Sequence, residues 1–527
     1  IGKKKETKQN SYYAKKNELF FQKNFYRMTR VITGGKMKKL LALIIACVFT
    51  LICFASCKSP SQSGSNGGNN GSNGSAGETA DYTPNIDMTD DDYNQTATLT
   101  VGVTADPYET DLVNALGAAF KQLFPNVTVE PVRISGSDYS SAVIGRYNAK
   151  NIPDIFYTSE TESFRFISSN LYLNLDPYIK AENEAYSPAD ENAPATWSAQ
   201  FVSGAMKLGQ KNYSGAQYFI PRSSDRIVTH LNMKYVKAAL EWDKRPDKSV
   251  TLDTVKNGWT WEEFVKVCEA IRAYYDSKGW TAANGRYILD ASFAWSPVLF
   301  SLFKSNGATF YENGKWSLDS DATRATIAMI RELVEKKIIA PTNGGGANYE
   351  NGSGAMLFHS SSAIKKYKNY IGENYDIVTF PVINGENGVT GYGVPGYGIY
   401  SGIDESKRDL AWQFLSFMLS ADGQNALAKA GMNTPSVRAD LQDYNTAAWG
   451  EGFRDINLAA TTYETESNYS EGFFLNFAAT TKTGLLGACS NFVNNIMNYN
   501  SKGEPSFTAA KCIETALKDL KKAAIVK

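Results

Sequence analysis

Aromatic and acidic side chains follow three predicted β-strands at the points where those strands end. Tyr108 comes after the run at 96–103 and Asp138 after the run at 127–134, whereas Tyr157 and Glu160 close a short run near 156. The carboxyl ends of parallel strands meet at one edge of a sheet, where ligands bind. Flat rings cover apolar faces of a solute, and carboxylates bond its hydroxyl groups. We therefore expect these four side chains to contact a polar ligand.

Five further candidates lie later in the chain. Arg222 and Asp225 stand between two extended runs, and Trp295 precedes an apolar helical run in a Ser/Pro context. His359 follows Gly-Ala-Met-Leu-Phe, and Tyr397 lies in a Gly-rich segment. Two alternatives stay open at this point, because each aromatic ring could pack in the core or on a surface, and Arg222 with Asp225 could form a structural ion pair.

The charge distribution argues against nucleic acid as a partner. Residues 1–57 hold 12 Lys/Arg and 2 Asp/Glu, so residues 58–527 carry a formal net charge of −10. Nucleic-acid binding needs a basic surface that displaces counterions. The chain has only 2 histidines, and it lacks the P-loop, HExxH and GxSxG motifs. We expect no metal site, no cofactor and no catalytic residue.

A glycan-cleaving enzyme is the main alternative to a binding protein. Such an enzyme would need two carboxylates roughly 5–10 Å apart across a sugar bond. Asp138, Glu160 and Asp225 could supply them. Nothing in their spacing marks such a pair, so binding without turnover is the preferred interpretation.

The elements that position these side chains have α/β character. Strand, helix and strand patterns alternate from 96 to 157, which predicts parallel strands flanked by helices. Thr260 and Glu263 have capping-box spacing and predict a helix that begins at this point. A chain of 527 residues fits two or three packed units.

The N-terminal region has the layout of a secretion signal. Met37-Lys38-Lys39 precedes an uncharged stretch at 40–56, and small residues stand just before Cys57. This pattern resembles a lipobox, in which the Cys57 thiol receives a diacylglycerol. A transmembrane helix is the alternative, although 17 residues are few for one.

We accordingly expect residues 37–56 to be a signal peptide and residues 57–95 to be the lipidated cysteine and a Ser/Gly/Asn-rich tether. Residues 1–36 are polar and basic and precede a complete signal, which favours untranslated upstream sequence with Met37 as the start. The body is then lipid-anchored at the outer face of the cell membrane.

The cysteines of the body show no metal-binding spacing. Cys268, Cys489 and Cys512 are far apart in the sequence, and their odd number prevents complete pairing among themselves. We expect buried thiols that act as small apolar side chains. A disulfide between Cys489 and Cys512 is the alternative.

The order of segments in the body resembles the family 1 extracellular solute-binding proteins, of the maltose-binding type. The resemblance covers residues 96–527 and rests on an ordered set of segments. The set includes FPNVTVEPVRISGSDY, NIPDIFYTS, YFIPRSSDRIVTHLNMKYV, GWTWEEFVKVCEAIR, and GYGIYSGI followed by DLAWQFLSFMLSADGQNAL.

The resemblance implies two α/β lobes, each a mainly parallel sheet flanked by helices, joined by a multi-strand hinge. Lobe 1 would comprise residues 96–221 and 396–438, and lobe 2 residues 222–395 and 439–527. The resemblance also implies a non-enzymatic monomer that captures a carbohydrate and passes it to the permease subunits of an ABC importer. A membrane-anchored glycan-processing enzyme and a surface adhesin are the alternatives, and the identity and chain length of the sugar stay open.

Overall fold

A computed structural model describes the residue ranges 83–136, 138–210, 215–383, 390–463, 469–470 and 482–524. For 160–161, 390–392, 469–470 and 482–483 it describes the backbone alone. The chain divides into two units, 1–77 and 78–527, and every described residue belongs to the second. The predicted signal peptide, Cys57 and most of the tether lie outside the described residues. Within the described ranges, no helix has both the length and the apolar character needed to cross a bilayer.

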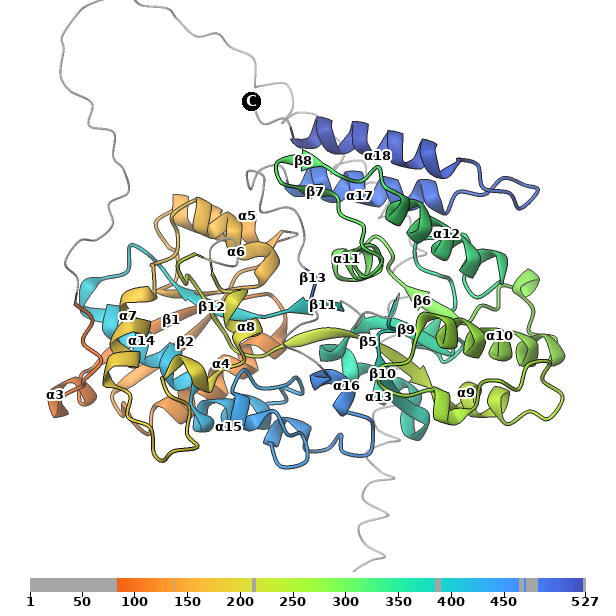
Figure 1. Cartoon of the computed structure of the whole chain (residues 1–527). Coiled ribbons are helices and arrows are strands. Elements are labelled where there is room, and N and C mark those ends of the chain that lie inside the picture. Colours follow the sequence, from red (N-terminus) through yellow and green to blue (C-terminus); the bar gives the residue numbers. More distant parts are fainter. Residues whose placement is uncertain are drawn as a thin grey trace, which may run out of the picture. The chain divides into compact units, whose positions relative to one another are not determined.

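The first lobe is built on a five-stranded sheet (Figure 1). Its order is β2 (Val127–Arg133), β1 (Ala97–Val103), β3 (Ile155–Thr158), β12 (Gly396–Ile399) and β4 (Ile220–Pro221). The helices are α3 (Asp90–Tyr93), α4 (Pro107–Phe120), α5 (Tyr139–Asn148), α6 (Glu160–Ser168), α7 (Asp176–Ala185), α8 (Ser203–Lys207), α14 (Glu405–Leu419) and α15 (Ala421–Lys429). Leu99 and Val101 of β1 pack with Phe120 and Trp412 in one buried cluster. This cluster holds α4 and α14 against the sheet.

The second lobe contains a six-stranded sheet. Its order is β13 (Tyr469–Ser470), β11 (Thr390–Gly393), β5 (Asp225–Asn232), β9 (Met356–Ser360) and β6 (Leu289–Ala291), and β10 (Tyr375–Thr379) also pairs with β5. A separate hairpin joins β7 (Tyr311–Glu312) and β8 (Lys315–Trp316). The helices are α9 (Met233–Leu240), α10 (Trp261–Ser277), α11 (Ser296–Ser305), α12 (Asp321–Glu335), α13 (Ile364–Ile371), α16 (Ala459–Thr462), α17 (Lys482–Ile496) and α18 (Ala509–Ala524). Helices α17 and α18 pack side by side (Figure 1).

The sheets are mixed rather than mainly parallel as predicted. In the first lobe β1 runs parallel to β2 and β3, but β12 runs antiparallel to β3 and β4. In the second lobe β5 runs antiparallel to β9, β10 and β11. The physical reason is the crossing between lobes: β4 leads out of the first sheet and β12 leads back into it, so the two must run in opposite directions. The same holds for β5 and β11 in the second sheet.

Three backbone passages connect the lobes and lie side by side. The first follows β4 and leads into β5, and the second joins β11 to β12 through 394–395. The third leaves the first lobe after Val437. Arg222 N donates to Pro395 O at 2.9 Å, and Ser224 N donates to Pro435 O at 3.0 Å. The first passage is therefore hydrogen-bonded to the second and to the segment at Pro435 and Ser436 that leads into the third. Together they form a narrow ribbon, a geometry suited to hinge bending.

A buried ion pair fixes the start of this ribbon to the first lobe. Arg222 Nη1 and Nη2 each donate to one carboxylate oxygen of Glu109, both at 2.7 Å. The two side chains are only 4% and 9% exposed. Burial lowers the pKa of Arg222, but the Glu109 charge more than offsets this and holds that pKa above its ordinary value. The guanidinium therefore stays charged, and α4 is tied to the first passage.

Removing one partner of this ion pair should lower the stability of the folded protein. Arg222→Met leaves the Glu109 carboxylate buried without its counter-charge, so the free energy of unfolding should fall by about 3–5 kcal/mol. Adding Glu109→Gln removes that charge and should recover a large part of the loss. Denaturant unfolding of both single variants and the double variant measures this coupling. Losses that simply add in the double variant would contradict the assigned interaction.

Both histidines of the chain lie in the second lobe, and His230 is completely buried. His230 Nε2 lies 3.1 Å from Ser360 O, which can only accept, so Nε2 carries the proton. Nδ1 then accepts from the Tyr375 hydroxyl at 2.7 Å. Burial, with His359 nearby, lowers the pKa of His230 to about 3. The folded protein consequently holds this ring neutral.

This neutral ring makes stability depend on pH. Between pH 6.5 and about 3 the unfolded chain binds a proton at His230 that the folded chain does not, so stability falls as the pH falls through that window. Below pH 6, we expect the wild type to lose roughly 1 kcal/mol per pH unit more than His230→Gln. Chemical denaturation at pH 7, 6 and 5 tests this, and parallel pH dependence of the two proteins would contradict it.

The three described cysteines are free and buried, as predicted. Cys268 lies on α10, Cys489 on α17 and Cys512 on α18. The alternative disulfide between Cys489 and Cys512 is not formed. Burial raises the pKa of Cys489 to about 12, so this thiol stays protonated.

Candidate ligand-binding site

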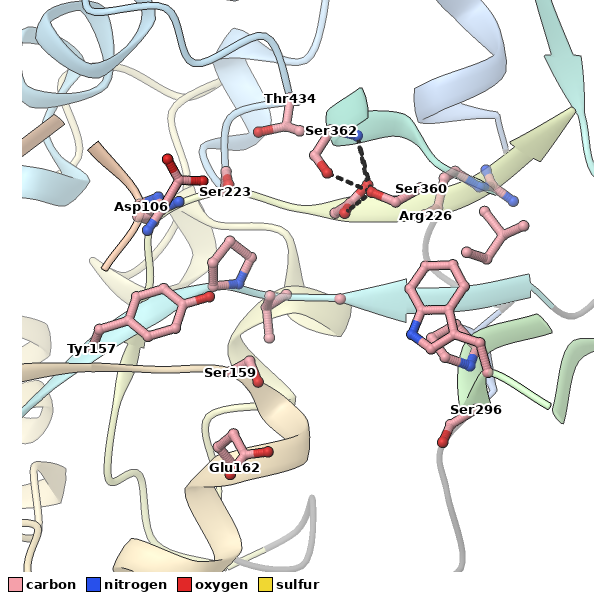
Figure 2. A pocket seen from close by; sticks show the side chains of 18 of the residues that line it. Asp106, Tyr157, Ser159, Glu162, Ser223, Arg226, Ser296, Ser360, Ser362 and Thr434 are labelled. Carbon is pink, nitrogen blue, oxygen red and sulfur yellow. Dashed lines mark hydrogen bonds between the residues drawn. The ribbon is translucent and has the colours of Figure 1, made fainter. Parts of the chain in front are cut away.

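A cavity of about 590 Å³ lies where the two lobes meet the ribbon of passages. Its lining comes from three sources, which are the first lobe, the second lobe and the passages between them. Figure 2 shows Tyr157 of the first lobe on one side of it and Ser296 of the second lobe on the other. The passages contribute Arg222, Ser223, Val394 and Pro395.

The wall from the first lobe is formed where strands end and helices begin. β1 and β3 are parallel neighbours, so the segments that follow them emerge at the same edge of the sheet. After β1, Asp106 caps α4 by accepting a hydrogen bond from Tyr108 N at 3.0 Å. The cap and the following Pro107 fix the first turn of α4, which places Tyr108 and Glu109 at the cavity.

Two tyrosines give this wall its aromatic surface. Burial raises the pKa of Tyr108 to about 12, although the nearby Arg222 charge opposes the shift, so the Tyr108 hydroxyl is a stable donor at neutral pH. The Tyr157 ring lies 5.7 Å from the Arg222 guanidinium carbon and 6.1 Å from the Tyr397 ring. Tyr397 is buried behind it, 5.9 Å from that same guanidinium carbon. The ion pair therefore also supports the aromatic wall.

The wall from the second lobe centres on Trp295, at the N-cap position of α11. The preceding loop is held by Asn343, whose side-chain oxygen accepts from Ala294 N at 2.7 Å and whose backbone oxygen accepts from Phe293 N at 3.0 Å. The Trp295 ring rests on the His359 ring, with centroids 5.2 Å apart. Burial lowers the pKa of His359, so this support is neutral at pH 7.

A serine turn at the end of β9 completes the second wall. Asp225 Oδ1 accepts from Ser361 Oγ at 2.7 Å and from Ser362 N at 3.0 Å, and Asp225 Oδ2 accepts from Ser360 Oγ. Ser362 N also donates to Ser360 Oγ at 3.1 Å. Figure 2 shows Ser360 and Ser362 close together on this side of the cavity. Asp225 thus orients the hydroxyl of Ser360 and the backbone of Ser362, two residues that line the cavity.

Five of the nine predicted site residues line the cavity together, namely Tyr108, Tyr157, Arg222, Asp225 and Trp295. The Arg222 and Asp225 side chains have structural partners, as the alternative interpretation allowed, but Arg222 pairs with Glu109 and Asp225 with the serine turn.

Four predicted residues are placed differently. Tyr397 and His359 lie behind the lining and support Tyr157 and Trp295. Asp138 caps α5, is not part of the cavity lining, and receives a hydrogen bond from Arg165 at 2.9 Å. Burial raises the pKa of Asp138, but hydrogen bonds from Ser141 and Arg165 outweigh it and hold that pKa below its ordinary value. Glu160 begins α6, and its side chain lies outside the described residues.

Several lining residues were not predicted from the sequence. They are Asp106, Glu109, Glu162, Arg226, Ser296, Ser360, Ser362, Thr434 and Leu486, among others. Glu109 adjoins Tyr108 and could have been included by position alone. Leu486 comes from α17, distant in sequence from the rest, and no local signal marks it.

The cavity suits a solute that carries many uncharged polar groups and also presents apolar faces. Three aromatic side chains offer flat surfaces, and hydroxyl groups from both lobes offer donors and acceptors. In the part of the chain that the structure describes, no cluster of three or more His, Cys, Asp or Glu could hold a metal ion.

Comparisons with known proteins place the chain in a family. The family profile described as bacterial extracellular solute-binding protein matches residues 115–452, more than half of the chain. No curated protein matches by sequence.

Solved structures with the same fold include three bacterial proteins. The GacH receptor of Streptomyces glaucescens GLA.O, solved unliganded and with acarbose, is 16% identical with a TM-score of 0.58, covering 82% of this chain and 99% of that chain. The substrate-binding protein Lmo0181 from Listeria monocytogenes, with cycloalternan, is 14% identical with a TM-score of 0.61, covering 81% and 99%. Maltose-bound MalE3 of T. maritima is 15% identical with a TM-score of 0.59, covering 81% and 100%.

These likenesses confirm the predicted two-lobed α/β fold. The family match, the two sheets joined by three passages and the cavity at their junction agree with one another. The chain belongs to the family of bacterial extracellular solute-binding proteins.

Proposed function

We propose that the protein captures a carbohydrate in the cavity between its lobes and delivers it to the permease of an ABC importer. The observation that carries this proposal is the combination of Tyr108, Tyr157 and Trp295 with hydroxyl groups from both lobes around one cavity. Sugar rings present C–H faces that stack on aromatic rings and hydroxyls that need paired donors and acceptors. The similar structures with acarbose, cycloalternan and maltose support a carbohydrate ligand.

The cavity size fits this class of ligand. A volume of about 590 Å³ lies within the range of roughly 300–1,000 Å³ that is usual for small-molecule sites. Because the two aromatic walls belong to different lobes, a bound sugar would contact both lobes at once. Bending of the three passages would then close the lobes on the ligand. Such a closed form is what a membrane permease could recognise.

We propose binding rather than catalysis for the same cavity. A glycosidase needs one carboxyl group as acid and a second as base or nucleophile. The lining contains four described carboxylates, of which Asp106 caps α4 and Glu162 accepts from Ser140 Oγ. Of the other two, Glu109 is held by Arg222 on both oxygens, and Asp225 is held by three serine donors. Both side chains therefore have positions set by the protein rather than by a reacting sugar.

Attachment to the outer face of the cell membrane is the second part of the proposal. Cys57 would carry the lipid, and the Ser/Gly/Asn-rich segment that follows would act as a flexible tether. About 20 such residues span roughly 25 Å on average. This reach would let the body collect solute and then turn toward a permease in the same membrane.

A thermal-shift screen against a sugar panel tests solute binding. A sugar at 100 times its dissociation constant should raise the free energy of unfolding by about 2.7 kcal/mol. For the sugar that binds, Trp295→Ala and Tyr157→Ala should each weaken affinity about tenfold or more, because each removes a stacking surface. Titration calorimetry measures the affinities.

Tyr370→Ala is the matched control, since Tyr370 is 56% exposed and outside the cavity lining. It should leave affinity unchanged. Unaltered affinity in both Trp295→Ala and Tyr157→Ala would remove these side chains from the site, and turnover of the bound sugar would favour the enzyme alternative.

Anchoring is tested separately from binding. Cys57→Ser should move the protein from the membrane fraction to the soluble fraction of cells and abolish labelling by a radioactive fatty acid. Cys268→Ser is the control because Cys268 is buried in the body. Continued lipid labelling of Cys57→Ser would show that the anchor lies elsewhere.

A further inference from the structure

The formal charges around the cavity do not balance. Its described lining contains the carboxylates of Asp106, Glu109, Glu162 and Asp225 but only the guanidiniums of Arg222 and Arg226. No lysine or histidine is part of that described lining. The described side chains therefore leave an excess of two negative charges at neutral pH.

Both guanidinium groups already donate hydrogen bonds to acceptors within the protein. Arg222 gives its two terminal nitrogens to Glu109, each at 2.7 Å. Arg226 is 4% exposed, and its Nη1 donates to the backbone oxygen of Tyr463. An anionic solute would have to compete with these internal acceptors for the cations that usually bind carboxylate or phosphate groups.

Neutral groups donate hydrogen bonds to the remaining carboxylates. Arg165 Nη1 donates at 2.8 Å to the Ser140 hydroxyl that also bonds Glu162, but the charge of Arg165 is paired with Asp138 at 2.9 Å. Asp106 accepts from Tyr108 N, and Glu162 accepts from Ser140 Oγ at 2.5 Å. Asp225 accepts from the serine turn. Figure 2 shows Glu162 next to Ser159 at the cavity, on the side of the first lobe. Hydrogen bonding thus orients these groups without neutralising them.

Helix dipoles do not reverse this balance. The N-terminus of α4 carries Asp106 as its cap and Glu109 in its first turn, and Glu162 lies in the first turn of α6. These carboxylates offset the partial positive charge at the N-termini of both helices. In the first turn of α11, Pro297 lacks the N–H group that another residue would offer to an anion.

We propose that the cavity selects uncharged or amino-substituted sugars and rejects acidic ones, such as those that carry uronate, sulfate or phosphate groups. This inference rests on the proposed carbohydrate function and narrows its ligand class. The excess of carboxylates repels an anion, whereas a neutral sugar pairs its hydroxyls with the carboxylates and a protonated amine gains from them.

Ion quenching tests the charge without any sugar. The emission of Trp295 is obtained as the difference between wild type and Trp295→Phe, and its quenching by iodide is compared with that by neutral acrylamide at low ionic strength. In Asp106→Asn/Glu162→Gln, which keeps the shape and one acceptor oxygen on each side chain, the iodide-to-acrylamide ratio should rise at least twofold. Asp91→Asn/Asp321→Asn, two exposed carboxylates outside the cavity lining, is the control and should not change it. An unchanged ratio in the cavity variant would overturn the proposal.

Matched ligands give the second readout. The neutral sugar that binds best in the panel is compared with its 6-carboxylate and its 6-amino derivative by calorimetry. The carboxylate should bind at least tenfold more weakly than the parent, the amine at least as tightly, and the carboxylate penalty should shrink in Asp106→Asn/Glu162→Gln. A carboxylate that binds as tightly as its parent would overturn the selectivity while the carbohydrate function stands. If no sugar binds, the proposed function fails, and the quenching result still decides the charge of the cavity.

Discussion

The bidentate pair of Glu109 and Arg222 is the interaction on which the architecture of the site depends. It joins the first turn of α4 to the first passage between the lobes, two segments separated by 113 positions in the sequence. The same guanidinium lies against the rings of Tyr157 and Tyr397. The first passage is also hydrogen-bonded to the second and to the segment that leads into the third. A buried pair of this kind is weak evidence for added stability, but breaking it by removing one partner is strongly destabilising. The pair therefore fixes the start of the first passage to the first turn of α4.

The two walls rely on different kinds of support. In the first lobe, helix starts that follow parallel strands place tyrosines and carboxylates directly at the cavity. In the second lobe, Trp295 rests on the neutral ring of His359, and Asp225 organises the serine turn. Behind these, the buried His230 links Ser360 to Tyr375. Each wall is thus held by its own lobe, so the two can move relative to each other without losing their internal contacts.

Local sequence patterns predicted the elements well. The Thr260–Glu263 spacing identified the start of α10, where both reciprocal hydrogen bonds of a capping box form. Tyr108 and Tyr157, which line the cavity, could be predicted because strand ends are readable from alternation and turn signals. Leu486 and the serine turn could not be predicted in this way, since the contacts that bring them to the cavity are long-range.

Asp138 shows why a site residue cannot be predicted from its position after a strand alone. Asp138 follows a strand just as Tyr108 does. However, a carboxylate directly before a helix can cap that helix, and Asp138 caps α5. Arg165 of α6 also donates a hydrogen bond to it. The mixed strand directions were likewise hidden, because they arise from the order in which the chain crosses between lobes. Neither the role of Asp138 nor the strand directions can be recognised from the periodicity of hydrophobic residues in the sequence.

The unlinked cysteines have a practical consequence for handling the protein. Cys268, Cys489 and Cys512 are enclosed within the second lobe and contribute only their small apolar volume. No covalent cross-link among them must be made before the body reaches its native state, and none can be lost to dithiothreitol. These three thiols accordingly require neither an oxidant nor a disulfide isomerase to reach their native state.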